Sequence, residues 1–154
     1  MTPKTVKRIQ EMITIPIAGG ERIYSRWQYA PYFENGSLGL IQPDLGTTGG
    51  FTEAKKIADM AYVYDVGVQA HVAGTPLSIA ASLHFEAVIP NFVIHEHHVF
   101  NIANFNRNLC IHDYQPKDGY IEIPDFPGIG NDLSEVAKKH MEIVTVKERI
   151  TAEK

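Results

Sequence analysis

The sequence contains little cysteine and no long apolar run. Its 154 residues include one cysteine, Cys110, which excludes an internal disulfide and is typical of a reducing compartment. No apolar stretch approaches the roughly 18 residues that a membrane-spanning helix needs. The first residues also lack the apolar core of a signal peptide. We therefore expect a cytoplasmic protein with no membrane partner.

The chain also lacks a strong excess of charge of one sign. Fourteen Lys and Arg against 18 Asp and Glu leave a net charge of -4, which argues against a nucleic-acid partner bound through a basic face. Hydrophobic residues make up 44% and charged residues 21%, as in ordinary globular domains, so disordered, collagen-like and coiled-coil chains are excluded. The length suffices for one core, but it is well short of the roughly 250 residues of a (β/α)8 barrel.

Residues 1–98 alternate between short apolar runs and segments of helical periodicity. A first helix is capped by Thr2, another covers 25–34, a third follows a glycine-rich loop with Thr52 as its N-cap, and a fourth begins at Thr75. Such alternation predicts βαβ units and a parallel sheet. The four predicted strands are 15–18, 38–41, 66–70 and 91–94.

The alternation stops in residues 99–154, which we expect to belong to the same domain. The stretch up to residue 131 is rich in Asn, Pro and Gly, with one predicted strand at 120–123. A charged tail, 147–154, is expected to fray. A last helix is indicated by Leu133, Val136, Ala137 and Met141.

An ionisable residue closes each of the four predicted strands: Glu21, Asp44, His71 and Glu96. The carboxyl ends of parallel barrel strands meet at one face, so these side chains are expected to lie together. Carboxylates are ligands for a hard ion such as Mg²⁺, and a His beside an Asp is oriented for acid–base work. Adjacent strands place Asp44 and His71 within reach of a hydrogen bond.

The histidine cluster at 95–98 leaves a second possibility open. A zinc site needs three or four ligands at tetrahedral angles, and His71, Glu96 and His98 are conceivable ligands. The alternative is a polar strand end beside a substrate pocket. The glycine pair Gly49-Gly50 is better explained as a tight loop than as a phosphate cradle.

Several motifs together resemble the mandelate racemase/muconate lactonizing enzyme family of the enolase superfamily, most of all its galactonate-dehydratase-type acid-sugar dehydratases. The resemblance runs from about Thr5 to Val144. It implies the C-terminal half, about strands 5–8, of a TIM-like (β/α)7β barrel, followed by a return segment. The motifs are PIAGGER (16–22), SRW (25–27), IQPDLGTTGG (41–50), QAH (69–71), HE (95–96) and GYIEIPDFPGIG (119–130).

The resemblance also implies roles for the strand-end residues. Glu21 matches a carboxylate that binds Mg²⁺, Asp44 and His71 match an acid–base dyad, and Glu96 matches a carboxylate that hydrogen-bonds the substrate or intermediate. The implied reaction is a lyase reaction: the proton α to a sugar-acid carboxylate is abstracted, and water is eliminated. The resemblance further implies that the remaining metal carboxylates come from an earlier part of the family fold, so that we expect an incomplete ligand set here.

Two functions therefore follow from the sequence. The first is a fragment or subunit of a Mg²⁺-dependent acid-sugar dehydratase, completed by a complementary N-terminal chain. The second is a non-catalytic remnant, or a half-barrel that self-associates so that two copies supply eight strands.

Overall fold

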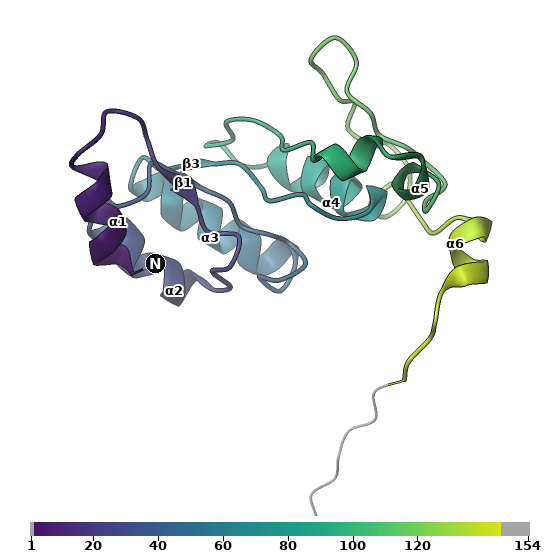
Figure 1. The fold of residues 1–154 in the computed structure, drawn as a ribbon, viewed down its shortest axis with the longest axis horizontal. Helices are drawn as coiled ribbons and strands as arrows, with labels where there is room; N and C mark the ends of the chain where they lie inside the picture. The colour runs from purple at the N-terminus through teal and green to yellow at the C-terminus, as the bar shows by residue number, and fades with distance from the viewer. Residues whose placement is uncertain (1, 146–154) are drawn as a thin grey trace, which may run out of the picture.

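The computed structural model describes residues 2–145, which form an elongated α/β structure with α1 at one end and α6 at the other (Figure 1). The predicted tail, 147–154, lies outside the described residues. No helix among residues 2–145 is long and apolar enough to cross a membrane. The elements in order are α1 Pro3–Gln10, β1 Ala18–Gly19, α2 Arg26–Glu34, β2 Leu40–Ile41, α3 Phe51–Val63, β3 Gly67–Val68, α4 Pro76–Glu86, the 3-10 helix η1 Val99–Ile102, α5 Asn104–Arg107 and α6 Glu135–His140.

The predicted parallel sheet is present, with its strands in sequence order β1-β2-β3. The fourth predicted strand is reduced to one parallel bridge, between Val68 and Phe92. Its next residues, Val93 and Ile94, are more than half exposed, so little packing supports a longer strand there. The sheet consequently has shorter strands than the apolar runs of the sequence predict.

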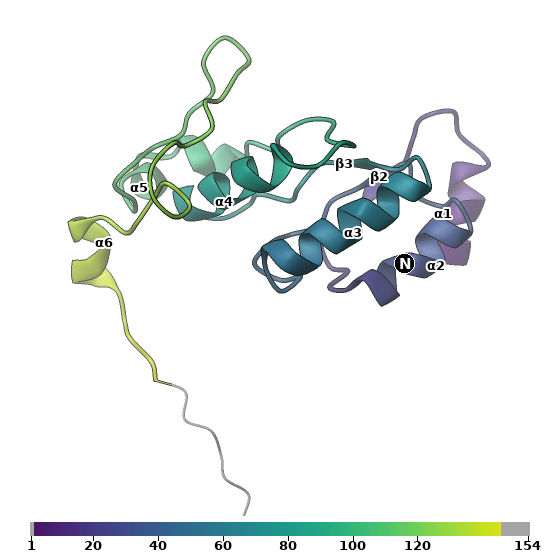
Figure 2. The same ribbon diagram turned by 180° about the vertical axis from the view of Figure 1, so that it is seen from behind.

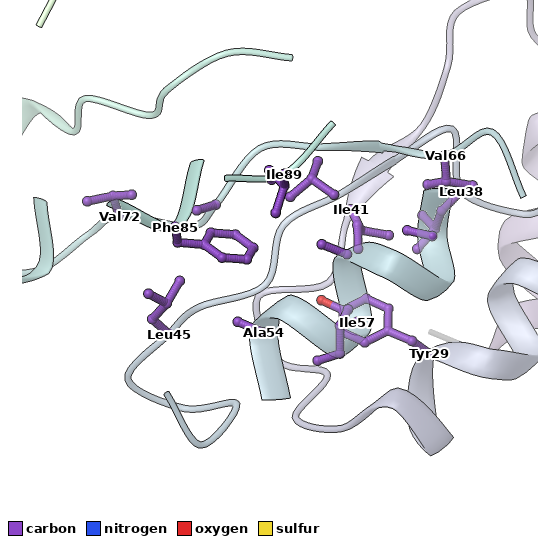
Figure 3. Close-up of a cluster of buried hydrophobic side chains, with 14 of the residues drawn as sticks. Tyr29, Leu38, Ile41, Leu45, Ala54, Ile57, Val66, Val72, Phe85 and Ile89 are labelled. Atoms are coloured by element: carbon purple, nitrogen blue, oxygen red, sulfur yellow. The ribbon is translucent and has the colours of Figure 1, made fainter. Parts of the chain in front are cut away.

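The hydrophobic core lies between the strands and helices α2 to α4. Helices α2 and α3 lie on the same side of the strands in both views (Figures 1 and 2). In Figure 3, Tyr29 and Ile57 lie beneath Ile41, and all three are fully buried. Ala54, Ile57, Ala58 and Ala61 form the buried stripe of α3 that the helical spacing predicts.

Helix starts follow the sequence in three cases, including α4, which begins directly after Thr75, and depart from it in one. The Thr2 side chain accepts from Thr5 N, and α2 begins directly after Ser25. The Thr52 cap prediction was wrong: Gly50 precedes the first helical residue of α3, with φ 84°. A glycine reaches this left-handed backbone region without steric cost, which a threonine does not.

The C-terminal part has less regular structure than predicted. The prediction of a strand at 120–123 was wrong, since Tyr120 makes only an isolated antiparallel bridge with Lys117. The last helix, α6, is present, but Leu133 and Met141 lie outside it and none of its residues is buried. Within the described residues, only this single bridge pairs with the segment 120–123, although Ile121 packs partly buried against the core.

Candidate active site

Asp44 and His71, which follow β2 and β3, are joined by a hydrogen bond. His71 Nδ1 lies 2.8 Å from Asp44 Oδ2, so the hydrogen bond expected from adjacent strands is present. A carboxylate only accepts, so Nδ1 carries the proton and donates it to this bond. The other ring nitrogen, Nε2, is left to exchange a proton with a bound molecule.

Backbone pairing between neighbouring parallel strands brings these two residues together. The backbone N–H of His71 donates to the carbonyl of Pro43 over 3.1 Å. Two residues before the dyad, Gln42 Nε2 donates to Gln69 Oε1 over 3.2 Å. Residues two apart on a strand share a face, so this glutamine pair and the dyad occupy the same side of the sheet end.

The second carboxylate oxygen of Asp44 stabilises the turn that follows it. Asp44 Oδ1 accepts from the backbone N–H groups of Gly46 and Thr47, at 2.8 and 3.2 Å. This turn fixes the orientation of the carboxylate and aims Oδ2 at His71. Asp44 is therefore both a turn residue and the partner of the imidazole.

Glu96 lies against the loop that carries His71. Its Oε2 accepts from the backbone N–H of Val72 over 2.6 Å. This bond places Glu96 at the same strand ends as the dyad, with one of its oxygens engaged by the protein itself. The substrate-binding role that the resemblance implies for Glu96 stays a prediction.

Glu21 follows β1 and its side chain is exposed. The preceding backbone is fixed by Tyr29, whose hydroxyl donates to the carbonyl of Gly20 over 2.8 Å. Gly20 has φ 125°, and a Cβ there would lie 2.5 Å from the Tyr29 oxygen, so the position requires glycine. Burial, and then the charge of Glu21, raise the pKa of Tyr29 above its ordinary value. Within residues 2–145, no hydrogen bond or ion pair joins Glu21 to the other three predicted site residues.

The part of the chain that the structure describes holds no group of three or more His, Cys, Asp or Glu side chains placed to bind a metal ion. One exposed carboxylate, Glu21, does not fit a Mg²⁺ site by itself, because that ion takes six oxygen ligands from protein, water and substrate. The zinc alternative finds no support either. His98, one of its conceivable ligands, accepts from the Phe100 N–H through Nδ1 over 3.2 Å.

A cavity of about 290 Å³ lies beside the dyad. Its polar lining residues are Asp44, His71, Ser78 and Ser82, and Phe51, Leu77 and Ile129 are among its apolar lining residues. Ile129 comes from the C-terminal part of the chain, which therefore contributes directly to the surroundings of the dyad.

Two further interactions near the strand ends were not predicted from the sequence. The guanidinium and backbone N–H of Arg26 donate to the two carboxylate oxygens of Glu53, each over 3.1 Å, and link the start of α2 to α3. The side-chain amides of Asn101 and Asn106 bond to the loop after His71. The asparagine-rich composition after residue 98 was the available signal for the second interaction.

Comparison with known proteins shows the family of the chain. The family described as enolase C-terminal domain-like matches residues 2–137. The chain belongs to this family. Its fold is thus that of an α/β domain of the TIM-barrel type, of which the three-stranded parallel sheet is a part.

Relatives of this enolase C-terminal domain-like chain are much longer than it is. It is 37% identical over 135 residues to D-galactonate dehydratase of Ralstonia nicotianae, covering 83% of this chain and 35% of that protein. A solved enolase-superfamily member from Salmonella Typhimurium is 51% identical with a TM-score of 0.91, over 96% of this chain and 38% of the other. An enolase from Agrobacterium radiobacter, solved with bound Na and L-malate, is 28% identical with a TM-score of 0.82, over 96% and 41%. The chain thus spans about a third of the length of the curated relatives it matches.

Proposed function

We propose that this chain carries the acid–base part of an acid-sugar dehydratase site. The observation that supports the proposal is the 2.8 Å hydrogen bond between Asp44 and His71 at the ends of adjacent parallel strands. Asp44 orients the imidazole, and His71 Nε2 moves the proton, either from the carbon α to the carboxylate or to the departing hydroxyl. The similarity to D-galactonate dehydratases favours a sugar acid as the substrate.

In this proposal the remaining chemistry comes from a complementary N-terminal chain. Glu21 contributes one carboxylate toward Mg²⁺, and the complement contributes the other ligands. The exposed position of Glu21, with no ion pair to Asp44, His71 or Glu96, leaves its carboxylate accessible to such a partner.

Complementation tests the proposal. The chain is assayed with Mg²⁺ and a panel of sugar acids including D-galactonate, first alone and then mixed with the N-terminal two-thirds of the Ralstonia nicotianae dehydratase. We expect turnover only in the mixture, and its loss in His71→Asn, because the side-chain amide cannot shuttle a proton. The matched control is His140→Asn, on the exposed end of α6. A mixture that turns over equally with His71→Asn contradicts the role of His71, and turnover by the chain alone contradicts the need for a complement.

The second candidate function is a non-catalytic, self-associating half-barrel. It is favoured by exposed apolar residues at the edge of the sheet beyond β3. The exposed fractions there are 43% for Phe92, 57% for Val93 and 59% for Ile94. Pairing of two copies would cover this edge. Light scattering distinguishes the candidates: twice the monomer mass without any Mg²⁺ heat in calorimetry supports self-association, and a monomer rules it out.

A further inference from the structure

The loop between β3 and α4, which begins with His71, is held by side chains from a segment far along the sequence. Val72 N donates to Glu96 Oε2 over 2.6 Å, and Val72 O accepts from Asn101 Nδ2 over 3.4 Å. Gly74 O accepts from Asn106 Nδ2 over 3.1 Å. The residue that follows the imidazole is therefore bonded on both its N–H and its carbonyl.

The two asparagines are buried and bonded to each other. Asn101 is fully buried and Asn106 is 8% exposed. Asn106 Nδ2 donates to Asn101 Oδ1 over 3.2 Å as well as to Gly74 O. A buried amide that loses its partners is costly, so the pair has little freedom to rotate away from the loop.

The asparagine pair is itself anchored to the C-terminal part of the chain. Gln115 Nε2 donates to the backbone carbonyl of Asn101 over 2.9 Å. Gln115 Oε1 lies 3.2 Å from His97 Nε2, close to Glu96 in sequence. The amides therefore connect three places: the segment after Glu96, the segment around Gln115, and the loop after His71.

We propose that Asn101 and Asn106 are positioning residues that fix the ring of His71 against Asp44. The backbone of His71 is held on its N-terminal side by the bond to Pro43 O. On its C-terminal side the only hydrogen bonds to Val72 come from Glu96 and Asn101, among the residues that the structure describes. Without the asparagine pair, the loop can rotate about Val72 and Gly74, and the Nδ1–Asp44 bond loses its fixed geometry. The importance of this positioning rests on the proposed function, whereas the positioning itself is measurable without turnover.

The experiment uses the full chain and records the ring ¹⁵N signals of His71 and the amide exchange rate of Val72 by NMR. The variants are Asn106→Leu, which keeps the branched shape and removes the hydrogen bonds, and Asn106→Asp, which keeps the size and removes the donor. We expect the Nδ1–H form of His71 to lose its dominance in both variants, and the Val72 amide to exchange at least tenfold faster. Asn106→Ser, which leaves room for water, is the variant that decides the matter if the other two do not fold.

Two controls separate positioning from a general loss of stability. Asn104→Leu changes an exposed asparagine of α5. Ile57→Val loosens the core in α3, away from the loop. Neither is expected to alter the His71 ring signals or Val72 exchange. The proposal is overturned if every folded Asn106 variant keeps the wild-type signals, or if Ile57→Val changes them as much. Intact positioning together with a failed complementation assay would reject the proposed function alone.

Discussion

Residues 2–98 and residues 99–145 are stabilised by different interactions. Every member of the main buried hydrophobic cluster falls between Val6 and Ile89, and the C-terminal part adds only the partly buried Tyr114 and Ile121. Side-chain amides of the C-terminal part donate to backbone carbonyls of the N-terminal part, at Asn101, Asn106 and Asn131.

The sequence therefore specifies the structure of the two parts in different ways. Apolar burial is non-directional and follows a periodic sequence pattern, so many side chains of suitable size form such a core. A buried amide works only where its donors and acceptors meet partners at hydrogen-bond distance. The N-terminal part therefore builds the scaffold of the site, whereas the C-terminal part fixes the loop that carries His71.

The largest expected effect is a break in the scaffold. Ile57→Ala removes a fully buried side chain from the face of α3 beneath β2, and leaves a cavity. We expect the free energy of unfolding to fall by about 2–5 kcal/mol, measured by chemical denaturation. Val63→Ala is the matched control, because Val63 is 78% exposed on the same helix and its truncation should cost about 0.5 kcal/mol or less. Equal losses in both variants would contradict the placement of the core.

A smaller effect is expected where the C-terminal part attaches to α4. Asn131 Nδ2 donates to the carbonyls of Pro76 and His112, and Asn131 Oδ1 accepts from the N–H of His112. Asn131→Ala removes these bonds and should lower the free energy of unfolding by about 1–2 kcal/mol. Asn104→Ala, at an exposed asparagine, should be close to neutral. If hydrogen exchange in 99–145 is unchanged in Asn131→Ala, amide bonding does not attach this part.

The smallest effect is expected from the buried pair Glu86 and His95, which lies outside the site and makes the free energy of unfolding depend on pH. Glu86 Oε2 lies 2.6 Å from His95 Nδ1, and burial raises the pKa of Glu86 above 4.5, partly opposed by His95. The folded state thus keeps its proton to a higher pH than the unfolded state. The stability from this group is fully present below pH 4.5 and is lost as the pH rises through the folded value.

Unfolding in urea across this pH range measures the effect. Glu86→Gln should flatten the decline, because an amide does not ionise. Glu122→Gln, at an exposed carboxylate, should leave the decline as it is in the wild-type chain. A decline that persists in Glu86→Gln would assign it to another group.

Much of the scaffold could be predicted from the sequence, because burial leaves a periodic trace. The stripe of α3, the Thr2 cap and the parallel strands before Asp44 and His71 all follow from local pattern. The strand at 120–123 could not be predicted correctly, since apolar alternation there has no neighbouring strand to pair with beyond one bridge. The Asn101–Asn106 pair left only a compositional trace in the sequence, because hydrogen-bond partners about 30 residues apart produce no periodicity.

The sequence by itself determined the α/β class, the order of the strands and the residues at their ends, because hydrophobic period and turn chemistry are local properties. Only the tertiary structure decided how those residues are used. It divided the Asp44 oxygens between a turn and the His71 ring, turned one Glu96 oxygen toward Val72, and left Glu21 exposed. Directional hydrogen bonds between distant segments make these choices, and they exist only once the strands and loops have been brought together.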